Sequence, residues 1–336
     1  MAVAVIPAPT FSEGDRVAWL EERLSGSGTR WRDGVGNLIW SIGEGPPDIL
    51  LTAHLDTVFD AATPLEIIRD GDVLRGPGVG DNAAAVAVAI NVFESLPRPL
   101  PAAVAFTVGE EGLGNLRGAS EAVAALKPRA VIALEGHGLD RVIVDAVGSL
   151  RARVSVRGDG GHPWIDRGAP SALHSLFTLG AELLALMSND LVVNVGTVSG
   201  GQSINCVAEH AEFLVEGRSL EPKLLESFDQ RLTALQVPFP LNVDVDVLGR
   251  RPTGRLDRRS RLLQVVLGVR DELGLGRALD AGSTDANIAL ALGIPAVALG
   301  VANGAGMHTP REWIDRRSLA LGCTQIERAL TQLTKR

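Results

Sequence analysis

Short continuous apolar segments alternate with amphipathic segments in the first part of the chain. The apolar runs over 48–58, 102–108 and 130–134 have the length of buried strands, and the pattern over 83–96 favours a helix. Strands that alternate with helices predict an α/β fold, with a mixed, mostly parallel sheet and helices on both faces. This pattern returns near the end of the chain, where a last helix is predicted over 314–333.

The pattern is different in the middle of the chain. Residues 151–157 alternate polar and apolar side chains, which is typical of a strand with one face in water. The segments that follow have the order β-α-β-β-α-β, which indicates a small two-layer α+β domain of ferredoxin-like type. We therefore expect one domain from residues 1–148 and 257–336, and a second domain, residues 149–256, inserted into it.

Composition limits the classes of partner. The 336 residues are 46% hydrophobic and carry a net charge of −8 without a basic block, so we expect no nucleic-acid partner. Residues 1–11 lack the charged region of a signal peptide, and the apolar stretch 286–302 is broken by glycine and proline, so we expect a cytoplasmic protein with no membrane contact. Cys206 and Cys323 lack metal-type spacing and are interpreted as two buried free thiols.

Polar side chains gather where the predicted strands end. Ligands of open α/β sheets bind at the carboxyl ends of the strands. Several carboxylates in one cleft would repel one another and lose hydration unless a divalent cation were bound. Imidazole with carboxylate, and no thiolate, suits Zn²⁺, with Mn²⁺ or Co²⁺ as alternatives. The residues concerned are His54, Asp56, Asp81, Glu110, Glu111, Glu135 and, after the last strand, His308.

Each of these residues also has an ordinary structural interpretation. His54 and Asp56 could form a polar pair within a strand, and Asp81 could cap a helix. Glu110 and Glu111 could form a solvated turn. Their common position at one edge of the predicted sheet favours a joint role in a metal site.

A series of short motifs extends along nearly the whole chain. They are TAHLDTV at 52–58, GVGDN at 78–82, GEEG at 109–112, GH at 161–162, GGQSIN at 200–205, GR at 217–218, GSTDAN at 282–287 and HTPREW at 308–313. In this order they resemble the di-zinc metallopeptidases of the aminoacylase and carboxypeptidase superfamily, clan MH. Its members include tripeptidase, acetylornithine deacetylase and succinyl-diaminopimelate desuccinylase.

The resemblance implies the metal ligands residue by residue. Asp81 would bridge two metal ions. His54 and Glu135 would complete the first site, and Glu111 and His308 the second.

The resemblance also implies catalytic roles beside the metals. Glu110 would be the general base that takes a proton from the attacking water and passes it to the leaving nitrogen. Asp56 would hold the ring of His54 and fix its tautomer. The peptide bond after Asp81 is often cis in the family.

Further matching positions imply how substrate is held. In family dimers the histidine that matches His162 reaches the partner's site and stabilises the oxyanion. Asn205, Arg218, Gly282 and Ser283 match substrate-binding positions, and Arg218 would grip a carboxylate by a bidentate contact. The inserted domain would thus serve as a lid and as the interface of a homodimer. A plain loop histidine and a strand-end charge are the alternative interpretations of His162 and Arg218.

Two departures from the motifs bear on the substrate. No lysine follows Asp81, and Ala286-Asn287 follows Asp285 where the deacetylase branch has arginine. Both departures favour a peptidase-like branch acting on small peptides, with an N-acyl amino acid deacylase as the alternative.

Functions other than hydrolysis are supported by weaker sequence features. The glycine-rich segment 76–80 could bind a nucleotide, but it lacks the third glycine of the dinucleotide fingerprint and the lysine of a phosphate loop. A non-catalytic small-molecule binder would have no need of Glu110. His137, His174 and His210 match no motif and are interpreted as structural or surface residues.

Overall fold

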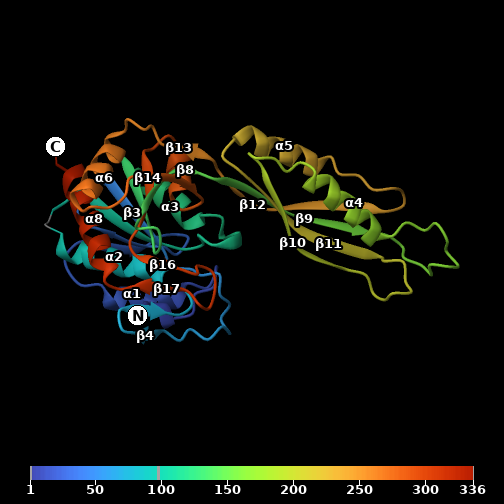
Figure 1. The fold of residues 1–336 in the computed structure, drawn as a ribbon, viewed down its shortest axis with the longest axis horizontal. Helices are drawn as coiled ribbons and strands as arrows, with labels where there is room; N and C mark the ends of the chain where they lie inside the picture. Colours follow the sequence, from blue (N-terminus) through green and yellow to red (C-terminus); the bar gives the residue numbers. More distant parts are fainter. Residues whose placement is uncertain (1, 97–98, 336) are drawn as a thin grey trace. The chain divides into compact units, whose positions relative to one another are not determined.

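A computed structural model describes residues 2–96 and 99–335 of the chain. It divides into two compact units, each described here by itself. Unit 1 comprises Met1–Ala146 and Gly254–Arg336, and unit 2 comprises Val147–Thr253 (Figure 1).

A nine-stranded mixed sheet forms the centre of unit 1. Its order is β1-β2-β6-β3-β7-β15-β8-β13, with β14 beside β8. The four central strands β6, β3, β7 and β15 are parallel to one another, whereas β2 and β8 join them antiparallel. The strands are β1 (Thr29–Arg32), β2 (Leu38–Ser41), β3 (Ile49–His54), β6 (Ala102–Thr107), β7 (Ala130–Glu135), β8 (Arg141–Ala146), β13 (Gly254–Arg255), β14 (Ala278–Gly282) and β15 (Ala296–Gly300).

The central strands end together because of their register. His54 at the end of β3 is paired with Thr107 at the end of β6, and Glu135 at the end of β7 with Gly300 at the end of β15. Every residue of β3 and β6 is buried, as expected for strands covered on both faces. The polar residues that follow these strands therefore emerge at one edge of the sheet.

Helices cover both faces of this sheet, which confirms the predicted α/β architecture. Helix α2 packs on β3, β6 and β7 and against α8, which also packs against α6; α3 and α7 pack against each other. Alanine and valine dominate α2, and most of its residues are buried, because it lies between the sheet and α8. The helices are α1 (Gly14–Arg23), α2 (Ala83–Ser95), α3 (Arg117–Leu126), α6 (Arg261–Glu272), α7 (Ala286–Ala291) and α8 (Ser318–Leu333).

A second, small sheet of unit 1 corrects the prediction for the last helix. The strands β4 (Ile68–Asp70), β5 (Val73–Arg75), β16 (Asn303–Ala305) and β17 (Trp313–Asp315) pair in the order β16-β17-β5-β4. The helix predicted from residue 314 begins only at Ser318. Pairing with β5 buries Ile314 in a strand, a non-local contact that overrides the helical pattern.

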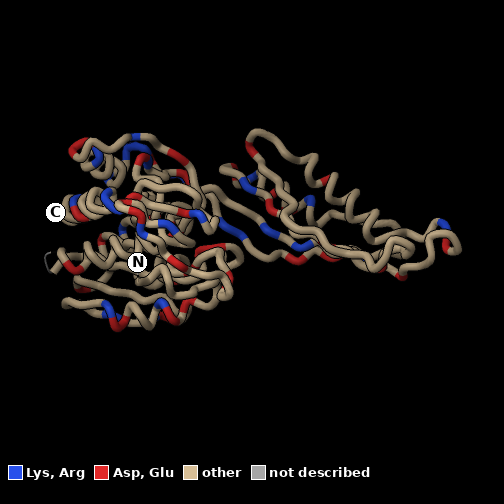
Figure 2. The backbone as a smooth tube through the Cα atoms, turned by 60° about the horizontal axis from the view of Figure 1, so that its bottom comes forward, with Lys and Arg blue, Asp and Glu red and all other residues tan. Residues whose placement is uncertain are grey.

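Unit 2 has the predicted β-α-β-β-α-β order. Its four strands form one antiparallel sheet in the order β10-β11-β9-β12. Helices α4 and α5 pack on this sheet over an apolar core. Basic and acidic positions are interspersed along β9, β11 and β12 (Figure 2). The elements are β9 (Gly148–Arg157), α4 (Ala172–Leu184), β10 (Val192–Gly200), β11 (His210–Ser219), α5 (Pro222–Thr233) and β12 (Asn242–Arg251).

The structure bears on the expected absence of membrane-spanning helices and on the burial of the two cysteines. Within residues 2–96 and 99–335, none of the helices combines the length and hydropathy that crossing a membrane requires. Both cysteines are free, but Cys206 is exposed. The expectation of two buried thiols was therefore wrong: the loop before β11 exposes Cys206, and Cys323 in α8 is only half-buried.

Candidate metal centre

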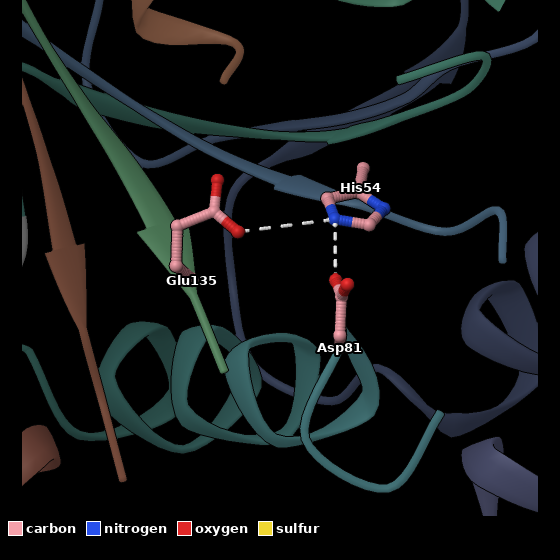
Figure 3. Close-up of side chains that lie close together, drawn as sticks. All are labelled: His54, Asp81 and Glu135. Carbon is pink, nitrogen blue, oxygen red and sulfur yellow. Dashed lines mark ion pairs between the residues drawn. The ribbon is translucent and has the colours of Figure 1, made fainter. Parts of the chain in front are cut away.

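The polar residues that follow the central strands of unit 1 converge at one edge of the sheet. His54 is the last residue of β3 and Glu135 the last of β7, while Asp81 lies two residues before α2. Glu110 and Glu111 follow β6 and are both buried. Figure 3 shows how the side chains of His54, Asp81 and Glu135 point toward one another.

Asp81 lies between two histidines. Nε2 of His54 is 3.0 Å from Asp81 Oδ1, and Nε2 of His308 is 3.0 Å from Asp81 Oδ2. Glu135 Oε2 is 4.0 Å from His54 Nε2, and Glu111 Oε1 is 3.2 Å from His308 Nε2. Two groups of three potential ligands therefore share Asp81: His54 with Glu135, and Glu111 with His308.

The donor atoms fit a pair of divalent cations. Atoms about 2.0–2.2 Å from a tetrahedral zinc ion lie ~3.3 Å from one another. In each group one ligand atom per residue lies within 4.8 Å of the others. Imidazole nitrogen and carboxylate oxygen suit Zn²⁺, Mn²⁺ or Co²⁺. The two oxygens of Asp81 face different histidines, so this carboxylate is placed to serve both groups.

The carboxylate of Asp56 orders the backbone of the two glutamates. Its Oδ1 accepts a hydrogen bond from the backbone N–H of Glu110 at 3.0 Å, and its Oδ2 accepts one from Glu111 at 2.8 Å and one from the Thr10 hydroxyl at 2.8 Å. The nearest acceptor for His54 Nδ1 is the Asp56 carbonyl oxygen at 3.1 Å, with the carboxylate at 3.6 Å. A carbonyl oxygen can only accept a hydrogen bond, so His54 Nδ1 carries a proton and donates to this oxygen. Nε2 then faces Asp81.

Two buried charged residues from the N-terminal segment support the same edge. Arg16 donates from Nη1 to the carbonyl oxygen of Leu55 at 2.7 Å, and burial lowers its pKa to about 10 against the attraction of nearby carboxylates. Glu13 accepts a hydrogen bond from the backbone N–H of Gly109 at 2.9 Å. Arg16 and Glu13 therefore hold the segments that carry His54 and Glu110 through hydrogen bonds to their backbone.

The carboxylates shift the pKa values of the histidines upward. Burial disfavours the charged form of His54, but hydrogen bonds to Asp56 and Asp81 outweigh it and hold its pKa well above the usual value. Hydrogen bonds to Asp81 and Glu111 raise the pKa of His308 to about 10. Despite its burial, Asp81 has a lowered pKa because both histidines hydrogen-bond to it. Protons on the rings thus offset the carboxylate charge that cations would otherwise neutralise.

The pKa values of two other carboxyl groups, Glu135 and Asp285, are shifted in the opposite direction from that of Asp81. Burial raises the pKa of Glu135 well above its usual value; His54 opposes this shift, and the charges of Asp81 and Glu110 add to it. Burial also raises the pKa of Asp285, although its Oδ2 accepts a hydrogen bond from Thr107 at 2.7 Å. Such perturbed carboxyl groups cluster where an ion or a reaction stabilises their charge.

The remaining residues singled out from the motifs are distributed over the two units. Gly282 ends β14, and Ser283 leads from it into α7 in unit 1. Unit 2 carries His162, Asn205 and Arg218. His162 and Asn205 are exposed on two loops that are joined by an isolated bridge.

Arg218 is separated from these loops within unit 2. It lies near the far end of β11, roughly 26 Å along the strand from His210 at about 3.3 Å per residue. Its Nε donates to Glu216 Oε2 at 2.7 Å. Unit 2 therefore does not gather its three candidates into one site.

Glu312 and His137, which no motif had marked as functional, form a pair that contacts the candidate metal centre. Glu312 is fully buried, and its carboxylate accepts a hydrogen bond from the backbone N–H of Asp81 at 2.7 Å. His137 Nε2 lies 2.7 Å from Glu312 Oε1. In the sequence, the signal for Glu312 was its place in the motif at 308–313. The signal for His137 was its position two residues after Glu135. His174 is exposed and His210 half-buried, as expected for histidines outside the site.

Comparison with known proteins agrees with this geometry. The family described as "Peptidase family M20/M25/M40" matches residues 50–332. The chain belongs to this family. It is therefore a hydrolytic enzyme, and the resemblance stated from the motifs is confirmed.

Individual relatives cover most of the chain. "Uncharacterized protein YqjE" of Bacillus subtilis (strain 168) is 26% identical over 297 residues, which span 80% of this chain and 77% of that protein. A tripeptidase structure from Staphylococcus aureus subsp. aureus Mu50 has a TM-score of 0.76 at 21% identity and covers 100% of this chain and 97% of its own. The metallo-carboxypeptidase Sso-CP2 from Sulfolobus solfataricus has a TM-score of 0.79 at 14% identity, over 99% and 98%. At such identities the structures establish the shared fold.

Proposed function

We propose that this enzyme is a di-zinc metallohydrolase that cleaves an amide bond of a small peptide. The observation that carries the proposal is the position of Asp81, whose two oxygens lie 3.0 Å from Nε2 of His54 and of His308. Membership in a peptidase family supports amide hydrolysis. Bound there, two Zn²⁺ ions would polarise the scissile carbonyl and lower the pKa of water.

The residues of the centre divide into ligands and a base. His54 and Glu135 would hold one ion, Glu111 and His308 the other, and Asp81 both. Glu110 is buried beside His54 and Glu111 in the same cluster. As neighbours in an extended segment, the two glutamates direct their side chains differently. Glu111 would then bind metal while Glu110 takes the proton of the attacking water and delivers it to the leaving nitrogen.

In unit 2, His162 is prepared to donate a hydrogen bond. Its Nδ1 accepts backbone N–H groups from Trp164 at 3.2 Å and Ile165 at 3.3 Å. The neutral ring therefore carries its proton on Nε2, where it could stabilise an oxyanion. Asn205 and Arg218 would help to hold substrate, as would Gly282 and Ser283.

A homodimer through unit 2 accounts for the contrast between the two edges of its sheet. The edge strand β10 carries no charged residue, whereas the other edge strand, β12, carries Asp244 and Asp246 on its exposed positions. Phe177 and Leu184 on the outer face of α4, which packs beside β10, are 61% and 42% exposed. An uncharged edge strand beside exposed apolar side chains is typical of a surface that pairs with another chain.

The dimer is tested by one charge on this surface. We expect Phe177→Glu to convert a dimer into a monomer in light scattering at working concentration, while Lys223→Glu on α5 leaves the dimer intact. A monomer in the unsubstituted chain would contradict the assignment.

Metal analysis tests the central proposal. We expect about two zinc ions per chain, loss of turnover on chelation and recovery with added Zn²⁺, Co²⁺ or Mn²⁺. A chain that binds no divalent cation under conditions where it hydrolyses an amide would refute it.

The principal alternative is an N-acyl amino acid deacylase with the same chemistry. A panel of dipeptides, tripeptides and N-acetyl or N-succinyl amino acids separates the two, because the scaffold is shared and only the acyl pocket differs. We expect some dipeptide or tripeptide to give a higher kcat/KM than every N-acyl amino acid. The reverse ranking would assign the deacylase activity.

Nucleotide binding by the glycine-rich segment is disfavoured by one observation. The backbone N–H groups of Gly78, Gly80 and Asp81 donate to the carboxylate of Glu312. A phosphate bound by this loop would have to displace that carboxylate. A calorimetric titration with nucleotides should therefore show no binding.

A further inference from the structure

The turn that carries Asp81 is held by a single buried carboxylate. Glu312 Oε2 accepts a hydrogen bond from the Gly78 N–H at 2.7 Å. Its Oε1 accepts from the N–H groups of Gly80 at 2.9 Å and Asp81 at 2.7 Å. Three backbone donors thus converge on one side chain that has no exposed surface.

His137 completes the surroundings of this carboxylate. Its Nε2 lies 2.7 Å from Glu312 Oε1, and because a carboxylate can only accept, Nε2 is the donor. The ring fits because two neighbours lack side chains. A Cβ on Gly80 would lie 2.7 Å from Glu312 Oε1, and one on Gly304 would lie 2.8 Å from His137 Nδ1. Both approaches are closer than Cβ atoms tolerate.

The carboxylate therefore joins three segments that each carry a candidate metal ligand. Asp81 ends the first segment. His308 precedes Glu312 by four residues in the second, and Glu135 precedes His137 by two in the third. The backbone reinforces the first connection, because the N–H of Gly76 donates to the carbonyl oxygen of Glu312 at 2.8 Å.

We propose that Glu312 is a positioning residue that sets the Asp81 carboxylate between the two metal ions, with His137 fixing the orientation of Glu312. The inference rests on the proposed di-metal function. Asp56 is a precedent within the same centre, since its carboxylate accepts the backbone N–H groups of Glu110 and Glu111. Glu312 performs the same task for Asp81 and ties it to the segment of His308.

The chemistry of an amide side chain provides the test. Glutamine has nearly the shape of glutamate, but its NH₂ group cannot accept a hydrogen bond. In Glu312→Gln either the Gly78 N–H or the pair from Gly80 and Asp81 would face a donor. The turn must then shift, and Asp81 moves with it.

The primary measurement is zinc affinity by competition with a chromophoric chelator. Removing such supporting hydrogen bonds typically costs 10–100-fold in metal affinity or activity, and we expect Glu312→Gln to weaken zinc binding by that factor. We also expect kcat at saturating zinc to fall while KM for the peptide changes little. The control is Asp72→Asn, because Asp72 lies in the turn between β4 and β5 and its carboxylate pairs with Arg316, just after β17.

Variants of His137 separate positioning from general destabilisation. His137→Gln keeps an N–H donor near the place of Nε2, and His137→Ala removes it. We expect His137→Ala to lose several-fold in zinc affinity and His137→Gln to recover most of that loss. Equal zinc affinities in the two variants would remove His137 from the proposal. These variants also test the arrangement if Glu312→Gln fails to fold.

The outcomes separate this inference from the function on which it rests. If the unsubstituted chain binds no zinc, the di-metal function fails. If it binds two ions and Glu312→Gln binds them as tightly, with an unchanged kcat, the function stands and Glu312 is no positioning residue. A lower melting temperature of the metal-free Glu312→Gln protein without any change in zinc affinity would likewise overturn the inference.

Discussion

Unit 1 and unit 2 bury different kinds of residue. Every buried carboxylate and histidine among residues 2–96 and 99–335 belongs to unit 1. In unit 2 the buried polar residues are four serines and Arg251. Its candidates His162 and Asn205 are exposed, and Arg218 is paired with Glu216.

This difference indicates how each unit contributes to function. Buried charges are costly unless they are paired or bind an ion. In unit 1 the buried charges lie at one edge of the sheet. Hydrogen bonds from other segments hold the carboxylates there before a ligand binds. Unit 2 has an apolar core, and its candidate residues His162 and Asn205 lie at its surface.

The largest expected effect is in unit 1. Replacing Glu110 by alanine or glutamine removes the proposed base, and general acid–base catalysis contributes about 10²–10⁴-fold. We expect kcat to fall by this factor while about two metal ions per chain remain bound, measured by steady-state kinetics and metal analysis. Loss of metal in Glu110→Gln would instead make Glu110 a ligand.

The corresponding substitution in unit 2 is His162→Ala. Loss of an oxyanion donor costs about 10²–10³-fold in kcat, and we expect this loss with unchanged zinc content. Lys223→Ala, on the exposed surface of α5, serves as the control and should retain the rate. An unchanged kcat in His162→Ala would leave unit 2 without a catalytic role.

Mixing inactive chains shows whether His162 acts across a dimer. A dimer of one Glu110→Ala chain and one His162→Ala chain has one site with an intact Glu110 and an intact partner His162. We expect activity to appear on mixing if the histidine acts in trans. No recovery after demonstrated subunit exchange would place it in its own chain's site.

A third effect comes from the raised pKa values in unit 1. The pKa of His308 is raised to about 10 and that of His54 lies well above its usual value, so without metal the surrounding carboxylates favour the protonated form of both rings. Zinc binds neutral imidazole and must displace these protons. We expect about two protons released and an apparent affinity that rises by about 10–100-fold per pH unit between pH 6 and 8, measured by calorimetry in buffers of different ionisation enthalpy. A pH-independent affinity would contradict the assignment of both rings.

The smallest effect concerns local stability. Free zinc at ten times its Kd stabilises a folded unit about tenfold, and only unit 1 should respond. Hydrogen exchange should slow at the segments around His54, Asp81, Glu111 and Glu135 and stay unchanged on β9 to β12. Equal protection in both units would mean that their stabilities are coupled.

Local pattern was sufficient for the central strands. The strand predicted over 102–108 ends one residue earlier, at Thr107, and the strand predicted over 130–134 extends one residue further, to Glu135. Continuous apolar runs mark buried parallel strands, and the polar residue after each run then falls at the ligand-binding edge.

The missing parts depend on contacts between distant segments. Strand β17 was predicted as helix because its pairing with β5 joins residues far apart in the chain. Glu312 lies 231 positions from Asp81, so no local period connects them. The exposed loop with Cys206 shows the same limit, since hydrophobic pattern does not report which way a loop turns.

The junction between β8 and β13 makes unit 2 a removable module. Ala146 and Gly254 are paired neighbours on antiparallel strands, so the chain leaves unit 1 and returns to it at adjacent points. A two-residue Asn-Gly turn is the usual way to close such a pair. A chain shortened by that turn in place of Val147–Thr253 would keep the nine-stranded sheet and every residue of the candidate metal centre, and it would lose the proposed dimer surface together with the rest of unit 2.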